Sequence, residues 1–200
     1  MDIGVLTIEY FRPGGMVMLP IIIVSFWMWV LIIERIVFFR KIEREDITLE
    51  QAVELIRGKS TIETDESLLS GLRGRVVAGF LRTRTVSTKL NYNILRYCTM
   101  RERPLLRRYL AVIGILAAVA PLLGLLGTVT GMMTTFNVIS IFGTGNARAM
   151  AGGISEALLT TQSGLLVAIP GLYMSIYLNR RAERLEGQLD ETVVALRRFV

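Results

Sequence analysis

A single acidic side chain, Glu156, stands inside a long apolar stretch of the sequence and is the residue best suited to chemistry. A carboxylate in the hydrocarbon of a bilayer costs several kcal/mol unless it is protonated, paired or hydrated. A carboxyl group in such surroundings is suited to take up a proton and release it again. Glu156 therefore predicts a place within a membrane where protons bind.

The depth of Glu156 depends on where its helix enters the bilayer, and two placements are open. Residues 149–155 contain no acid or proline, so a helix starting near Asn146 puts Glu156 about 15 Å deep. Residues 157–179 are also long enough to cross unaided. Glu156 would then lie at the outer interface, favoured by the helix N-terminus.

Hydroxyl side chains follow Glu156 closely and extend the candidate site. On a helix, Thr160 and Ser163 fall within about 40° of Glu156, whereas Thr161 and Gln162 fall well away from it. A stripe of Glu156, Thr160 and Ser163 would offer a line of polar groups. Thr161 and Gln162 need an adjacent helix or a local distortion to join that line.

An earlier apolar stretch carries small and polar residues at helical spacing. Gly124, Gly127 and Gly131 are three and four residues apart, which lets another backbone approach closely and predicts a helix-packing face. Thr128 and Thr135 join Gly124 and Gly131 in a small, polar stripe. Each threonine either bonds a carbonyl one turn back in its own helix or faces protein or water. Facing the Glu156 stripe, this one would line a narrow polar path.

Three segments are apolar enough to position these residues by crossing a membrane, which takes about 20 helical residues. The chain has 200 residues, 52% of them hydrophobic, more than a soluble domain of this size normally carries. The predicted fold is an all-α integral membrane protein whose three spans extend into a helical bundle. The predicted spans are residues 14–33, 109–141 and 149–179.

Basic residues set the predicted orientation. Sixteen of the 23 Lys and Arg residues lie between the first and second spans and five follow the third. The positive-inside rule therefore places the helical loop 34–108 and the C-terminal helix 180–200 in the cytoplasm. It places residues 1–13 and the turn 142–148 in the periplasm. Acidic residues are interspersed among the basic ones, so we expect contact with membrane lipids and no binding of nucleic acid.

The composition excludes most enzymes. Histidine is absent and Cys98 is the only cysteine, which removes the usual zinc sites, disulfide frameworks and Ser-His or Cys-His nucleophiles. No nucleotide-binding loop or metal cluster is visible. We expect no catalytic residue, metal or cofactor.

Helical signals also fill the loop between the first two spans. The segment 48–51 fits a capping box, which predicts a helix stopping at Gly58. Further helices are predicted over residues 66–82 and 86–103, the latter leading through Pro104 into the second span. At the end of the first span, Glu34-Arg35 either pair with each other or are solvated at the interface.

These residues together resemble the MotA/TolQ/ExbB proton-channel family, in its short three-span ExbB/TolQ branch. The resemblance covers most of the chain. It is carried by GGMVMLP and IIERI in the first span, APLLGLLGTVTGM with TTF in the second, and GGISEALLTTQSGLLVAIPGL in the third. The form of the third motif and the compact length favour the ExbB-like group.

The resemblance implies a bacterial inner-membrane homo-oligomer, typically a five-fold ring. Its pore would hold the single membrane helices of an ExbD/TolR-like partner, with a TonB-like protein as a further candidate partner, and proton-motive force would drive work on the periplasmic side. By motif, Glu156 matches the intramembrane glutamate, Thr128 the threonine of the GTV motif, and Thr161 the threonine five residues after the glutamate.

Two alternatives remain open at this point. The chain could be a non-conducting membrane scaffold, its glycine faces assembling a complex and Glu156 anchoring a basic neighbour. Sodium is an alternative to the proton, because hydroxyl and carbonyl oxygens also bind it. A transporter acting alone is disfavoured, since three spans give no internal repeat.

Overall fold

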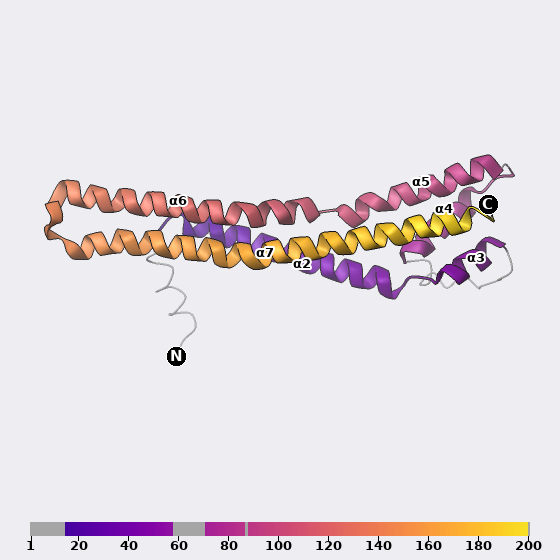
Figure 1. Cartoon of the computed structure of the whole chain (residues 1–200), viewed down its shortest axis with the longest axis horizontal. Helices are drawn as coiled ribbons and strands as arrows, with labels where there is room; N and C mark the ends of the chain where they lie inside the picture. The colour runs from indigo at the N-terminus through magenta and orange to yellow at the C-terminus, as the bar shows by residue number, and fades with distance from the viewer. Residues whose placement is uncertain (1–14, 58–70, 87, 200) are drawn as a thin grey trace. The chain divides into compact units, whose positions relative to one another are not determined.

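The computed structural model describes residues 15–57, 71–86 and 88–199, and every regular element in these ranges is helical (Figure 1). Three helical stretches are long and apolar enough to cross a membrane: one is α2, one is α6 with the preceding α5, and one is α7. The predicted all-α membrane fold is confirmed. The elements are α2 (Met18–Arg44), α3 (Leu49–Arg57), α4 (Leu72–Thr83), α5 (Thr88–Arg107), α6 (Leu110–Phe142), η2 (Gly143–Gly145) and α7 (Ala147–Leu196).

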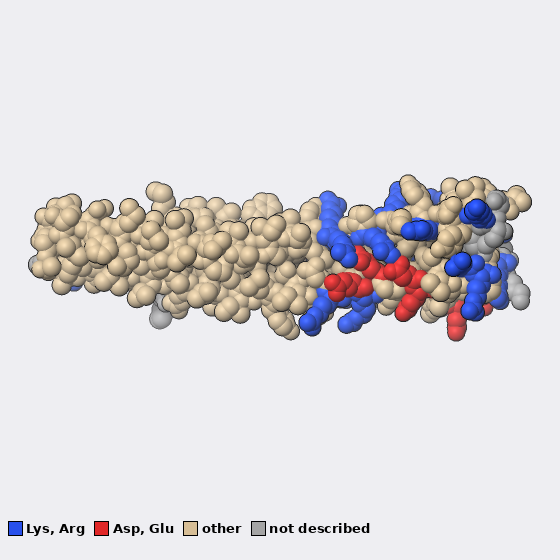
Figure 2. Space-filling model, turned by 45° about the horizontal axis from the view of Figure 1, so that its top comes forward, with Lys and Arg blue, Asp and Glu red and all other residues tan. Residues whose placement is uncertain are grey.

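The chain divides into two compact units. We call the first the span unit; it comprises the residues up to Ile32 together with Ala111–Ile176. The second, the charged unit, comprises Ile33–Leu110 and the residues from Tyr177 onward. Arg148 and Glu156 are the only charged residues in the described part of the span unit. On the face shown in Figure 2, the charged side chains gather over the charged unit.

Within the span unit, α6 and α7 run antiparallel and pack through small residues. Gly131 on α6 faces Ala157 on α7, while Gly124, earlier on α6, faces Gly164, later on α7. We call this contact the seam. The buried residues on the α7 side of the seam are Gly153, Ala157, Thr160, Gly164, Ala168, Gly171 and Ser175.

The charged unit has a core of larger side chains and a set of ion pairs. Phe39, Phe80 and Leu95 are buried in it. The ion pairs link α7 to α2 and α5: Arg107 binds Glu186 with two bonds of 2.6 and 2.7 Å, Arg181 binds Glu43, and Arg103 binds Asp190. The guanidinium of Arg107 lies on Glu186 in the two-bond geometry that arginine and carboxylate favour.

Helix α3 of the charged unit begins as its sequence predicts. The Thr48 N–H donates to the Gln51 side chain at 3.0 Å, and the Gln51 N–H donates to Thr48 Oγ1 at 3.3 Å. This reciprocal pair is the capping box, and α3 follows it directly. The predicted capping box is confirmed.

The next two helices differ from their predicted limits. Gly71 is not helical, so α4 begins at Leu72; the start predicted at residue 66 lies outside the described residues. The following helix, α5, passes through Pro104 and ends at Arg107. The helix predicted to end at residue 103 therefore continues for four more residues.

Arg35 explains where α5 ends. Its Nη1 donates to the carbonyl oxygen of Leu105 at 3.0 Å, one of the last four carbonyls of α5, which lack partners inside the helix. Its guanidinium also lies over the rings of Phe38 and Tyr109. Tyr109, at φ 64°, is the one non-glycine residue with positive φ in the part of the chain that the structure describes.

The solvated alternative for Glu34-Arg35 is wrong for the arginine. Arg35 is only 2% exposed, and it binds both carboxylate oxygens of Glu34 at 2.5 and 2.7 Å. Because Tyr109 and Leu105 come from a segment some 70 residues away, neighbouring residues in the sequence could not show that Arg35 is enclosed.

Candidate functional site

The glycines of α6 bring the two helices of the seam into backbone contact. A Cβ at Gly131 would lie 2.8 Å from the Ala157 nitrogen and from the Gly153 oxygen. A Cβ at Gly124 would lie 3.1 Å from the Thr160 oxygen. Only glycine allows this approach, because even a methyl group would meet backbone atoms that cannot move aside.

Thr160 is part of this packing. Its side chain is 0% exposed and lies against Gly127 of α6. Its hydroxyl is within 3.0 Å of two carbonyl oxygens of its own helix, those of Glu156 and Ala157. In the single chain, Thr160 therefore fills the seam and has no surface facing an open path.

Thr161, the next residue, bridges the two helices. Its half-buried hydroxyl lies 3.3 Å from the Gly124 carbonyl oxygen on α6 and 3.2 Å from the Ala157 oxygen on its own helix. The sequence places Thr161 away from Glu156 and requires a neighbouring helix for it to join a polar line. That neighbouring helix is α6.

Thr128 lies at the edge of the seam. It is half-buried and donates to the Leu125 carbonyl oxygen at 2.6 Å, three residues back in its own helix. Gly124, Gly131 and Thr135 of the predicted stripe are buried, so the stripe divides into a packed part and one accessible hydroxyl. Thr128 has only one proton to donate, but its oxygen can still accept a hydrogen bond.

Glu156 is half-buried in the span unit, and its carboxylate lies against the backbone of Gly15 at the start of the α2 segment. A Cβ at Gly15 would overlap the carboxylate, and Gly15 also has a positive φ of 61°. Within the described residues, the Glu156 side chain has no hydrogen bond or ion pair. Nor do three metal-ligating side chains gather anywhere in that part of the chain.

The predicted pathway residues do not all meet within one chain. Five residues on a helix turn by about 140°, so Glu156 and Thr161 lie on opposite flanks of the seam. Thr161 faces α6 at Gly124, close to Thr128, while Glu156 faces Gly15. The single chain brings Thr128 and Thr161 to one flank and leaves Glu156 on the other.

Two further polar residues of α7 were not assigned to the site from sequence. Ser155 and Gln162 are exposed, seven residues apart, and line the same shallow groove on α7. The hydroxyls of Thr160, Thr161 and Ser163 find carbonyl partners, but Ser155 and Gln162 have none in the described part of the chain. Their spacing of seven places them on one face, a signal the sequence already contained.

Comparison with known proteins connects these features to a family. The model of the MotA/TolQ/ExbB proton channel family matches residues 61–191. The putative biopolymer transport protein ExbB-like 3 of Synechocystis sp. is 32% identical over 197 residues, covering 93% of each chain. The biopolymer transport protein ExbB of Salmonella typhimurium is 30% identical over 170 residues, covering 78% of this chain and 68% of that protein.

A third relative matches a shorter part. The biopolymer transport protein ExbB of Aquifex aeolicus is 40% identical over 80 residues, covering 40% of this chain and 53% of that protein. Together with the three apolar helices, these matches indicate a multi-pass inner-membrane protein of a transport family rather than an enzyme family. The chain belongs to the MotA/TolQ/ExbB proton channel family, and the relatives named above are ExbB or ExbB-like proteins.

Proposed function

We propose that this chain is an ExbB/TolQ-like proton-channel subunit that uses proton-motive force to energise transport or mechanical work across the cell envelope. The observation that carries the proposal is Glu156, the only acidic residue of the described span unit, whose carboxylate has no partner there. An intramembrane carboxylate of this kind is free to exchange a proton. Thr128 and Thr161 supply further hydroxyls along the path.

The geometry of the span unit supports an assembly of several copies. A path that includes both Glu156 and Thr161 needs groups from more than one flank of the seam, and a ring of copies supplies them. Ser155 and Gln162 point the same way, because an amide facing lipid costs free energy unless another chain bonds it. Following the family resemblance, we propose a ring of five copies.

The partner and the orientation complete the proposal. An ExbD/TolR-like protein would place its single membrane helix, with a proton-carrying aspartate, in the ring, and a TonB-like protein would receive the work. The distribution of basic residues supports a periplasmic N-terminus and a cytoplasmic C-terminus by the positive-inside rule. No aspartate lies in the described span unit, so we expect the subunit alone to conduct poorly.

Proton flux into proteoliposomes tests the proposal. With the co-purified partner present, Glu156→Gln should lower the flux at least tenfold, because glutamine keeps the size and hydrogen bonding but cannot bind the proton. Glu191→Gln, a change of the same kind at an exposed position of α7, is the matched control and should leave the flux unchanged. Ready conduction by the lone subunit that is lost in Glu156→Gln would contradict the requirement for a partner.

The competing function is a non-conducting scaffold. The closely packed seam at Gly124, Gly127 and Gly131 is the observation that favours it, since such faces assemble helices without conducting anything. A scaffold should tolerate Glu156→Gln. A pull-down from the native membrane separates the two further: a small single-span protein with a membrane aspartate supports the channel, and recovery of the chain alone supports the scaffold.

A further inference from the structure

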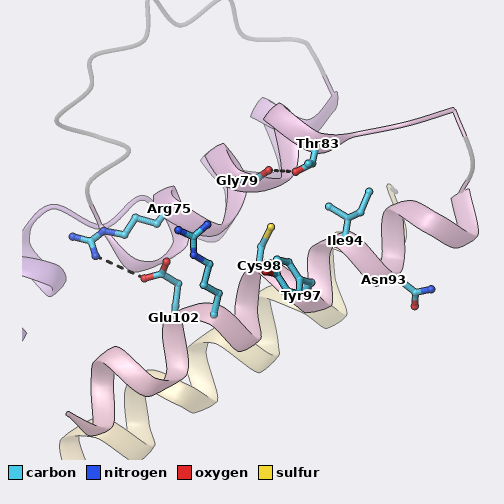
Figure 3. Close-up of a pocket in the computed structure, with 9 residues that line it drawn as sticks. Arg75, Gly79, Thr83, Asn93, Ile94, Tyr97, Cys98 and Glu102 are labelled. Carbon is cyan, nitrogen blue, oxygen red and sulfur yellow. Dashed lines mark hydrogen bonds and ion pairs between the residues drawn. The ribbon is translucent and has the colours of Figure 1, made fainter. Parts of the chain in front are cut away.

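A second candidate site lies in the charged unit, between α4 and α5. A cavity of about 350 Å³ opens there, close to the lower limit for pockets that hold small molecules. Among the residues that the structure describes, its walls come from these two helices (Figure 3). Nothing in the proposed proton path uses it.

The cavity has a charged end. In Figure 3, Arg75 of α4 and Glu102 of α5 point toward one another, and their charged atoms are 3.7 Å apart. Arg101 also lines the cavity, so two guanidinium groups face one carboxylate. For Arg101, no hydrogen bond or ion pair is found in the part of the chain that the structure describes. This end therefore carries a net positive charge.

The rest of the cavity is less polar. Ile94, Tyr97 and the thiol of Cys98 line it from α5, and Gly79 lines it from α4. The thiol lies only 3.2 Å from where a Cβ of residue 79 would stand, so glycine keeps this space open. A molecule with an anionic group and a short, weakly polar body fits such a lining.

The carboxylate of Glu102 is a buried hydrogen-bond acceptor at the charged end. Its side chain is 13% exposed, and its Oε2 atom is buried without a hydrogen-bond donor among the described residues. A buried acceptor without a donor costs free energy. A ligand that carries a hydroxyl beside its anionic group would supply the missing donor.

We propose that this cavity binds a small soluble molecule bearing a phosphate group, with Arg101 and Arg75 on its oxygens. Guanidinium groups bind phosphate through paired N–H donors, and a phosphate has enough oxygens to engage two of them. A soluble source fits better than a lipid headgroup. Arg101 lies nine residues, or about 13 Å, before the start of α6 at Leu110, beyond the interfacial layer of a bilayer.

Cys98 provides a direct test of the charge preference, because it is the only thiol of the chain and lines the cavity. Two methanethiosulfonate reagents of similar size, one anionic and one cationic, should react with Cys98 at rates whose ratio favours the anion. Arg101→Gln should lower that ratio about fivefold or more. Any change in the reactivity of the thiol itself slows both reagents equally and cancels in the ratio.

Arg96→Gln is the matched control, since Arg96 is an exposed arginine on the same helix that does not line the cavity. It should leave the ratio unchanged. An equal fall in both variants would show a general surface charge and overturn the proposal. Normal thermal unfolding of each variant in detergent confirms that the comparison is made on folded protein.

Protection of Cys98 from N-ethylmaleimide tests binding itself. In lipid-free detergent, millimolar inorganic phosphate should slow the labelling of the parent chain at least threefold, and Arg101→Gln should abolish this protection. Sodium chloride at equal ionic strength controls for screening. Protection by phosphatidylglycerol vesicles but not by phosphate would assign the site to a lipid, and absence of any protection would leave no anion site; either result overturns the proposal.

Discussion

Helix α7 passes through both units, and the side chains on its buried face differ in size between them. In the span unit its buried face consists of small residues such as Gly164 and Gly171. In the charged unit the same face continues with Leu178, Leu185 and Leu189. The spacing of three and four residues is kept throughout, and only the size of the side chains changes.

The difference follows from the surroundings of each unit. In water, burying a leucine removes apolar surface from solvent and stabilises the fold by about 1.5–3 kcal/mol. In lipid this gain is absent, because lipid chains are as apolar as leucine, and helices associate through close contact of small residues. The boundary between small and large residues on α7 therefore marks where water replaces lipid as the solvent.

The largest effect should come from the leucine face. Leu189 is 0% exposed, so Leu189→Ala should destabilise the chain by about 2–5 kcal/mol by removing buried groups and leaving a cavity. The midpoint temperature of thermal unfolding in detergent should then fall by about 5–15 °C. Val194→Ala, at a position 70% exposed on the same helix, is the control and should change little. Equal effects of the two substitutions would mean that this face is not a core.

Arg35 of the charged unit and Glu156 of the span unit should respond oppositely to neutralisation. Arg35 is enclosed and hydrogen-bonded to Glu34 and Leu105, so Arg35→Gln leaves the Glu34 carboxylate and the Leu105 carbonyl without this partner and should cost about 2–3 kcal/mol. Glu156→Gln removes a carboxylate that has no partner among the described residues and should not lower the unfolding temperature, although we expect it to lower the proton flux. Arg40→Gln, at an exposed position of α2, controls for loss of charge alone. A drop in unfolding temperature for Glu156→Gln would reveal a structural partner.

The seam should resist even the smallest enlargement. A Cβ at Gly164 would lie 2.7 Å from the Ala120 carbonyl oxygen, so Gly164→Ala should destabilise the chain by about 1–3 kcal/mol. At Gly152, also on α7, nothing lies within 4 Å of the added atom, and Gly152→Ala should be neutral or stabilising by up to about 1 kcal/mol. The pair is read from unfolding curves of the two purified variants. An unchanged stability of the Gly164→Ala variant would show that α6 and α7 are not closely packed at this position.

The smallest effect concerns a carboxylate in the charged unit. Burial raises the pKa of Asp46, although its Oδ1 accepts a bond of 2.7 Å from the Arg73 N–H. A raised pKa favours the folded state at low pH, and this contribution is lost as the pH rises through the folded-state pKa. Asp46→Asn keeps the acceptor and should gain about 0.5 kcal/mol over the parent near neutrality. The gain should vanish in unfolding curves recorded at pH 3.5; a constant gain would exclude the titration of Asp46 as its cause.

Short sequence patterns predicted much of this structure. Three apolar stretches predicted the membrane helices, and four residues at 48–51 predicted the start of α3, because both signals act over a few turns. The break before α6 was not predictable in this way. It involves the bond from Arg35 to the Leu105 carbonyl, a contact between distant parts of the sequence.

The candidate site was predictable in its residue types but not in their partners. Helical periodicity placed Thr160 near Glu156 and Thr161 away from it, and α7 has this geometry. Periodicity could not say that Gly127 would cover Thr160 or that the Gly124 carbonyl would meet Thr161, because that depends on which face of α7 meets α6. Motif resemblance, which favoured Thr161, contained information that one helix alone does not.

The lengths of the helices make bilayer thickness a variable in their own right. The uncharged part of α2, residues 18–33, rises about 24 Å, whereas the 33 residues of α6 rise about 50 Å. A hydrocarbon layer of about 30 Å is thicker than the first length and thinner than the second. In lipids with longer chains α2 becomes the limiting element, and in shorter ones more of α6 must tilt or be covered by other chains. No single bilayer thickness therefore matches the lengths of both α2 and α6. The thickness of the lipid layer decides which helix surfaces are exposed to water.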